Sequence, residues 1–327
     1  MQTSSRPDLL SMLDSQPDLP FEMAMDAAFR YQSVSNALYE QFIDLTGGRD
    51  RHAFYPCLPI QCFKTHNVQS GDWTPETWFT SSGTTGQQNS RHPVRYLESY
   101  LHNALAGFAQ FYGNPSNWVI IALLPSYLER NGSSLVAMAD ALIKKSGYPE
   151  SGFFLDDFEH LKSTLIHCKT NNYPTILLGV SFALLDFAHY SPMDLSGMII
   201  METGGMKGRR KELTRTELHR MLQKAFSVEK VHSEYGMTEL FSQAYTKGGT
   251  IYYPSRTMKV FATEINDPFC LVEPGKTGVL NVVDLANIDT CSFIQTEDIA
   301  RVFADGSFEM LGRLDAAELR GCNLMIE

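Results

Sequence analysis

The feature that most constrains the fold is an alternation of short apolar runs with amphipathic segments in the middle of the chain. Three apolar runs have the length and residue types of buried strands, and they cover 118–124, 175–180 and 198–201. Apolar residues recur at helical spacing around these runs, which predicts helices near 94–112, 133–146, 157–170, 182–189 and 212–225. Strands that alternate with helices form a largely parallel sheet covered on both faces. The sequence therefore predicts an α/β fold.

The two ends of the chain carry different patterns. From residue 21 to residue 45, apolar residues recur near helical spacing after Pro20, which suits a first helical turn, so one core-facing helix is predicted. After Gly248, β-branched residues and turn pairs such as Pro274-Gly275 replace the helical period. We therefore expect an N-terminal helical segment over 1–50, an α/β core over 51–247 and a β-rich lobe over 248–327 that ends at a hinge-like motif.

Composition and charge narrow the class of protein. With 43% hydrophobic and 20% charged residues, the 327-residue chain is typical of a soluble globular protein. Its net charge of −10 weighs against nucleic acid as a partner, because phosphate backbones are bound by clustered Lys and Arg. No apolar run approaches the roughly 18 residues of a membrane span, and the N-terminal segment lacks the pattern of a secretory signal. These features predict a cytoplasmic protein without a membrane span.

A loop rich in glycine and hydroxyl side chains lies early in the chain. Its sequence is Ser81-Ser82-Gly83-Thr84-Thr85-Gly86. Glycines let backbone N–H groups surround an oxyanion, and the Ser and Thr hydroxyls add hydrogen-bond donors without bulk. The loop is not a Walker A motif, since no Gly-Lys-Ser or Gly-Lys-Thr follows. Alone, such a segment is more often an ordinary surface turn, but with a second motif downstream it predicts a phosphate-binding loop.

The second motif, Tyr235-Gly236-Met237-Thr238-Glu239, follows a helical pattern at the place where another strand is expected to end. A tyrosine beside a glycine offers a face on which a purine can stack. Thr238 can donate a hydrogen bond to an α-phosphate, and Glu239 can hold Mg²⁺, a hard cation that prefers carboxylate and phosphate oxygens. The alternative interpretation is a strand end followed by a polar loop that binds nothing.

Together the two motifs resemble the signature motifs of adenylate-forming enzymes, the superfamily of acyl-CoA synthetases, peptide-synthetase adenylation domains and luciferases. The resemblance implies ATP and Mg²⁺ as cofactors. It also implies the large N-terminal-type domain of these enzymes, with layered α/β lobes and a C-terminal β-rich lobe. Further residues match in chain order: the likeness implies that Gly204 and Gly205 contact the adenine, that Asp298 binds the ribose, and that Arg313 fixes ribose or phosphate near the hinge.

Within this superfamily the chain is most similar to the acyl-protein synthetase component of bacterial fatty-acid reductases, the luminescence-type enzyme that moves an acyl group from the adenylate to its own cysteine. The residues that carry the likeness are Phe63-Lys64, 79–86, 232–239 and Arg320-Gly321-Cys322-Asn323-Leu324. The likeness implies that Cys322 is the acylated thiol, whose thiolate attacks the mixed anhydride and releases AMP. The alternative is a buried, inert thiol, and the six cysteines lack the paired spacing of a zinc site or a disulfide framework.

Two departures from the family pattern concern the pyrophosphate and the lid. The loop continues as Gln87-Gln88-Asn89-Ser90 where many members carry Pro-Lys, so backbone and hydroxyl groups are expected to contact the pyrophosphate. The C-terminal lid domain of acyl-CoA synthetases, with its catalytic lysine, is expected to be absent. Either the enzyme works without a lid or a partner contributes, and the resemblance implies a reductase or an acyl carrier as that partner.

The sequence thus predicts an ATP-dependent acid–thiol ligase that activates a carboxylic acid of the fatty-acid type and transfers the acyl group to a protein cysteine. One alternative is a ligase whose acceptor is CoA or an acyl-carrier protein, and another is a non-catalytic nucleotide-binding module. A hydrolase is a third, because Gly179-Val180-Ser181 resembles part of a GxSxG elbow, although alanine replaces the second glycine. Ser181 is instead predicted to cap a helix.

Overall fold

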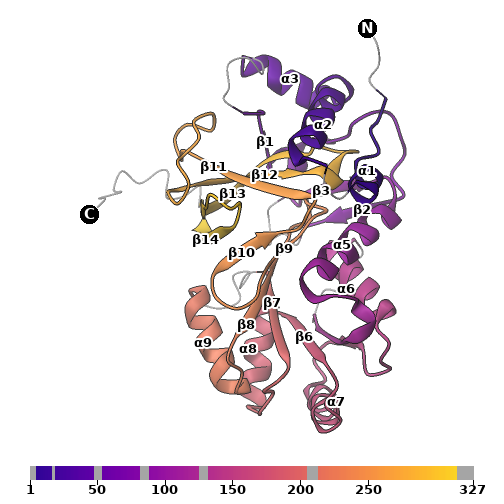
Figure 1. The fold of residues 1–327 in the computed structure, drawn as a ribbon, viewed down its shortest axis with the longest axis vertical. Helices are drawn as coiled ribbons and strands as arrows, with labels where there is room; N and C mark the ends of the chain where they lie inside the picture. The colour runs from indigo at the N-terminus through magenta and orange to yellow at the C-terminus, as the bar shows by residue number, and fades with distance from the viewer. Residues whose placement is uncertain are drawn as a thin grey trace, which may run out of the picture.

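The structure is a computed structural model, and it describes residues 5–16, 19–47, 54–81, 88–124, 132–204 and 213–314 (Figure 1). The helices are α1 Leu9–Ser15, α2 Phe21–Ser35, α3 Ala37–Leu45, α4 Cys62–Thr65, α5 Leu97–Tyr112, α6 Ser134–Lys145, α7 Phe158–Thr170, α8 Ser181–Tyr190 and α9 Arg215–Phe226. The strands are β1 Leu58–Pro59, β2 Thr77–Thr80, β3 Arg91–Val94, β4 Val119–Leu123, β5 Gly152–Phe154, β6 Thr175–Val180, β7 Ile199–Thr203, β8 Val231–Tyr235, β9 Ala244–Thr246, β10 Ile251–Pro254, β11 Met258–Thr263, β12 Thr277–Asp284, β13 Phe293–Val302 and β14 Phe308–Arg313.

One long sheet runs through the molecule in the order β11-β12-β13-β14-β10-β9-β8-β7-β6-β4-β5, with β1 added beside β13. The strands from β5 to β8 pair in parallel, whereas the pairs from β8 through β9 and β10 to β11 are antiparallel. Strands β2 and β3 form a separate antiparallel hairpin. This arrangement confirms the predicted α/β fold with a C-terminal β-rich lobe.

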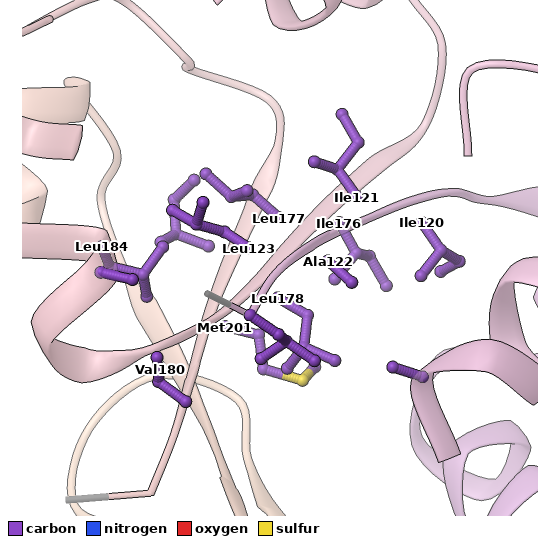
Figure 2. Packing of buried hydrophobic residues seen from close by; sticks show 14 of the residues in the cluster. Ile120, Ile121, Ala122, Leu123, Ile176, Leu177, Leu178, Val180, Leu184 and Met201 are labelled. Atoms are coloured by element: carbon purple, nitrogen blue, oxygen red, sulfur yellow. The ribbon is translucent and has the colours of Figure 1, made fainter. Parts of the chain in front are cut away.

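The parallel half is a buried sheet whose strands are apolar on both faces. Every residue of β4 and β6 is buried, and Figure 2 shows their side chains packed with Leu184 of α8 and Met201 of β7. The turn from β6 into α8 is tight, because a Cβ on Gly179 would lie 2.8 Å from the Leu184 side chain. Parallel strands carry ligand-binding loops at their carboxyl ends. The segments after β6, β7 and β8 therefore share one edge of the sheet.

Most of the predicted elements in this half are confirmed. The expected strand at 175–180 coincides with β6, and the expected strands at 118–124 and 198–201 correspond to β4 and β7. The five predicted helices correspond to α5, α6, α7, α8 and α9. The sequence pattern missed β2, β3, β5 and β9, because strands of three or four residues are too short to display a period.

The prediction of one continuous helix from 21 to 45 is wrong. The chain forms α2 and α3 with Asn36 between them in an extended conformation. Asn36 caps α3, because its Oδ1 accepts from the Tyr39 N–H at 3.0 Å, and its Nδ2 donates to the Thr290 carbonyl at 2.9 Å. Apolar spacing continues across the break, so periodicity alone does not reveal it.

The N-terminal helices pack against the β-rich lobe (Figure 1). Ala28 and Phe29 of α2 share a core with Leu280, Phe293 and other residues of β12 and β13. The Gln32 amide, also on α2, is fully buried and donates to the carbonyls of residues 287 and 288, each at 3.0 Å. Of the helices in the described ranges, none has the length and apolar character to cross a membrane.

Candidate functional site

The hairpin of β2 and β3 carries the predicted phosphate-binding loop. Residues 82–87, which hold Ser82, Gly83, Thr84, Thr85 and Gly86, lie outside the described residues. The residues on either side of this segment are hydrogen-bonded to each other. The Ser81 N–H donates to the Ser90 carbonyl at 3.0 Å, and the Ser90 N–H donates to Ser81 Oγ at 2.8 Å. These two bonds bring both ends of the loop together at the top of the hairpin.

The second motif begins where β8 ends. Tyr235 is the last residue of β8, and the chain turns at once, with the Leu240 N–H donating to the Met237 carbonyl at 3.1 Å. A Cβ on Gly236 would lie 2.5 Å from Glu234 Oε1, so a larger residue there would displace the Glu234 side chain. The motif is thus a tight loop at the edge of the sheet where the parallel strands end.

The tertiary structure brings the two motifs into contact at Glu239. The Glu239 side chain is buried, with 6% of its residue surface exposed, and the Ser90 side chain lies beside its carboxylate. Burial raises the pKa of Glu239, and the nearby Ser90 side chain and the charges of Arg313 and Lys64 oppose that shift. An approaching cation would stabilise the ionised form of this buried carboxylate.

A second contact between the motifs involves His92, which sequence analysis missed. His92 lies on β3 and is fully buried. Its Nδ1 lies 2.8 Å from the Thr238 carbonyl oxygen and its Nε2 lies 3.0 Å from Thr290 Oγ1. Burial lowers the pKa of His92 to about 4, so the ring is neutral at physiological pH. A single buried histidine carries no sequence signal that separates it from a core residue.

The residues expected at the ribose lie together on neighbouring strands. Asp298 of β13 faces Arg313 of β14 directly, and Asp298 Oδ1 lies 3.4 Å from Arg313 Nε. The Tyr235 hydroxyl donates to Asp298 Oδ2 at 2.8 Å. Burial raises the pKa of Asp298, and Arg313 opposes this shift. The Arg313 side chain is 70% exposed, so its guanidinium is accessible to a ligand.

The ring of Tyr235 is more enclosed than the sequence suggested. Tyr235 is 8% exposed, and its ring packs edge to face against Phe308 at 5.4 Å between centroids and against Tyr252 at 5.9 Å. Burial raises the pKa of its hydroxyl well above the ordinary value, so it stays a neutral donor to Asp298. Stacking of a purine on this ring stays a prediction.

A buried polar network lies beside Gly204, at the end of β7. Gly204 adopts a φ of +66°, a conformation that favours glycine, and its carbonyl accepts from Ser181 Oγ at 2.7 Å. Ser181 also donates to Glu202 Oε2 at 3.0 Å. The predicted capping role of Ser181 is wrong, because α8 begins at Ser181 itself and its capping residue, Val180, has no polar side chain. Gly205 and Cys322 lie outside the described residues.

Glu234 is a second buried acid that sequence analysis did not select. It precedes Tyr235 on β8 and accepts a hydrogen bond from Thr203 Oγ1 on β7. Burial raises its pKa to about 7, with a further contribution from the nearby Glu202 carboxylate, while the bond from Thr203 opposes the shift. An acid of this kind is poised between its neutral and charged forms at physiological pH.

The residues present fit a Mg²⁺ ion that arrives with a nucleotide. Over the described ranges, no cluster of three or more His, Cys, Asp and Glu side chains could hold a metal ion. Proteins commonly hold Mg²⁺ with one or two carboxylates, and substrate phosphates and water complete the octahedron. The single buried carboxylate of Glu239, next to the phosphate-loop hairpin, matches that requirement. Asp298 offers a carboxylate acceptor, and the exposed Arg313 guanidinium beside it offers a cation.

Comparison with solved structures shows an adenylate-forming fold. 2-Hydroxyisobutyryl-CoA ligase, in an open conformation with 2-HIB-AMP and CoA, has a TM-score of 0.67 and 12% identity, covering 93% of this chain and 71% of that chain. ATP-bound MatB from Rhodopseudomonas palustris has a TM-score of 0.54 and 15% identity, covering 74% of this chain and 49% of that chain. The chain therefore spans about half the length of MatB. No protein-family model and no curated protein matches the sequence.

Proposed function

We propose that this protein activates a carboxylic acid with ATP to form an acyl-adenylate. The observation that carries the proposal is the direct contact of the two motifs: His92 of the β2–β3 hairpin bonds the Thr238 carbonyl at 2.8 Å, and Ser90 of the same hairpin lies beside the Glu239 carboxylate. The second motif follows β8 at the edge where the parallel strands end, which is where ligands of α/β sheets bind, and the separate β2–β3 hairpin that carries the first motif contacts it there. The ligase with the higher TM-score contains an acyl-AMP, which supports the same chemistry here.

In the proposed reaction, a carboxylate oxygen of the acid attacks the α-phosphorus of ATP. The bond between the α-phosphorus and the oxygen that bridges to the β-phosphorus breaks, and that oxygen leaves with pyrophosphate. No general base is needed, because a carboxylic acid is already ionised at neutral pH. Residues 81–86 and Thr238 would donate hydrogen bonds to the phosphate oxygens. Glu239 would hold Mg²⁺, which neutralises charge on the phosphates when bound. Asp298 and Arg313 would hold the ribose, and Gly204, Gly205 and Tyr235 would border the adenine.

The test of adenylation is acid-dependent exchange of pyrophosphate into ATP, measured across a panel of acids that includes fatty acids. Glu239→Gln should reduce the exchange by about 10²-fold or more, because it removes the charge that holds the cation next to the reacting phosphate. The matched control is Glu229→Gln, which changes an exposed carboxylate. Glu239→Gln protein with wild-type exchange would contradict the assigned role. Wild-type protein that binds ATP but exchanges with no acid would favour a non-catalytic nucleotide-binding module.

We further propose that the acyl group passes to the thiol of Cys322, as the likeness to acyl-protein synthetases implies. The Cys322 thiolate would attack the acyl carbon, forming a thioester and releasing AMP. Among the described cysteines, Cys57 and Cys291 are buried and have a raised pKa, so their thiols are poor nucleophiles. A reductase or an acyl carrier would then receive the acyl group, and a fatty acid is the acid class that this likeness implies.

Intact-protein mass spectrometry after incubation with ATP, Mg²⁺ and mixed acids measures the transfer. Cys322→Ser should retain pyrophosphate exchange but lose the hydroxylamine-sensitive acyl adduct completely. Cys270→Ser, which changes a partly exposed thiol, is the control and should keep the adduct. An unchanged adduct on Cys322→Ser protein would refute the thioester.

Transfer to CoA is the second candidate, and the CoA bound in the 2-hydroxyisobutyryl-CoA ligase structure favours it. In that case Cys322→Ser protein should convert added CoA to acyl-CoA at the wild-type rate. Chromatography of the CoA thioesters distinguishes this outcome from protein acylation.

A further inference from the structure

Two consecutive backbone carbonyls of the second motif are held by buried side chains from elsewhere in the chain. His92 of β3 bonds the Thr238 carbonyl at 2.8 Å. The Asn287 amide, from the 3₁₀ turn Leu285–Asn287, donates to the Glu239 carbonyl at 2.7 Å. Asn287 is 1% exposed, and its Oδ1 has no hydrogen-bond partner. The side-chain bond of Asn287 is therefore the one that its Nδ2 donates to the Glu239 carbonyl.

The protonation of His92 follows from its two partners. A backbone carbonyl only accepts, so Nδ1 must carry the proton that bonds Thr238. Because the buried ring is neutral, Nε2 carries no proton and accepts from the Thr290 hydroxyl. The ring is also stacked on Phe241, with centroids 4.6 Å apart and planes 20° from parallel. These contacts fix both the tautomer and the orientation of the ring.

The far side of the same loop is also anchored. The Asp284 carboxylate accepts from the Phe241 and Ser242 N–H groups at 2.8 and 2.9 Å. Residues 238–242 are thus held by His92 of β3 and by Asp284 and Asn287. His92 differs from the others because it lies directly after the phosphate-binding loop, two residues beyond Ser90, and so connects the position of that hairpin to Thr238.

We propose that His92 is a positioning residue, which holds Thr238 and Glu239 in register with the phosphate-loop hairpin by donating from Nδ1 to the Thr238 carbonyl. This inference rests on the proposed function. His92 touches no reacting atom, and it acts through the backbone of the residues that do. Misplacement of a reacting group by about 1 Å costs on the order of 10²-fold in rate, so a single buried bond at this place has a large effect.

The variants His92→Phe and His92→Asn separate the bond from the ring. Phenylalanine keeps the stacked ring but removes the donor, and asparagine loses the ring but offers an amide donor near the position of Nδ1. His92→Phe should lower kcat for pyrophosphate exchange by about 10²-fold with the KM for ATP changed less than about 3-fold, and His92→Asn should recover most of the loss. Recovery by asparagine is not expected if the ring serves only to fill the core, and equal losses in the two variants would contradict the inference.

Amide hydrogen exchange supplies a readout that does not depend on activity. In folded His92→Phe protein, residues 236–242 should exchange at least about tenfold faster than in wild type, because their anchoring bond is lost. His160→Phe, on the exposed face of α7, is the control and should leave this segment unchanged. Unchanged amide hydrogen exchange over residues 236–242 in folded His92→Phe protein overturns the inference, whatever the activity of that variant. Wild-type protein without pyrophosphate exchange contradicts the proposed function alone.

If His92→Phe does not fold, Thr290→Val carries the test. Valine keeps the volume of threonine but cannot donate to Nε2, so the imidazole loses the partner that fixes its orientation. We expect a loss in kcat of about 5- to 10-fold, the value of one modest hydrogen bond, and faster hydrogen exchange over 236–242. Wild-type values for both would overturn the inference.

Discussion

At the scale of single residues, the site is defined by buried groups whose charge depends on their neighbours. Glu239 and Asp298 are carboxylates with a raised pKa in positions that a cation or a hydroxyl could approach. Glu202 is also buried, but His219 Nε2 lies 3.7 Å and Arg215 Nε 3.2 Å from its Oε1, and these partners lower its pKa despite burial. Burial favours the neutral form of all three carboxylates. Hydrogen bonds and positive charges from neighbouring residues oppose this effect, and their strength decides whether the pKa ends above or below its ordinary value.

Glu234 leads to a prediction about pH and stability. Its pKa is about 7 in the folded protein against 4.5 ordinarily, so the folded state binds more protons between these values. The free energy of unfolding should therefore fall as pH rises from 5 to 8, by up to about 3 kcal/mol from this residue. Glu234→Gln should flatten that dependence, as measured by urea denaturation at several pH values. The Glu229→Gln control should keep the wild-type pH dependence. The same pH dependence of the free energy of unfolding in wild type, Glu234→Gln and Glu229→Gln would contradict the prediction.

At the scale of secondary structure elements, the sequence pattern located long elements well and boundaries less well. Strand β6 was predicted to the residue because its six residues are all apolar or β-branched apart from one glycine, and they lie between Pro174 and Ser181. The break between α2 and α3 was missed because Asn36 interrupts the backbone without interrupting the apolar stripe. The bond from Asn36 to the Thr290 carbonyl joins segments far apart in sequence, so no local periodic signal records it.

The break at Asn36 leads to a prediction about stability. Asn36→Ala should lower the free energy of unfolding by about 2 kcal/mol, from the lost cap of α3 and the lost bond to the Thr290 carbonyl. Asn36→Ser keeps an oxygen that can cap the helix and should lose about half as much. Urea denaturation of the three proteins measures the difference. Equal stability of Asn36→Ala and wild type would show that the interruption of the helix does not depend on this side chain.

At the scale of the whole molecule, segments far apart in sequence meet around the second motif. The N-terminal segment closes on residues 285–290, where Arg6 makes two hydrogen bonds to Asp289, at 2.6 and 2.7 Å, and Gln32 donates to nearby carbonyls. Those same residues hold Glu239 through Asn287. The helices at the start of the chain therefore belong to the structure that supports the candidate site.

The sequence by itself determined the α/β class, the β-rich lobe, and the two motifs with their order along the chain. These features depend on local periodicity and on residue types within a few positions, which a linear pattern records. The resemblance to adenylate-forming enzymes supplied Asp298 and Arg313 as candidates for the ribose site, and the structure places these two residues opposite each other on neighbouring strands.

Only the tertiary structure decided which of these residues touch and which buried groups support them. His92 and Thr238 are separated by 146 positions, and Tyr235 and Asp298 by 63, so no local pattern connects them. Nor does the sequence show that Glu234 and Glu239 are buried enough to raise their pKa values, because desolvation depends on what packs around a carboxylate in space. The physical reason is the same for all of these residues. Hydrogen bonds and burial are made between neighbours in space, and folding chooses those neighbours.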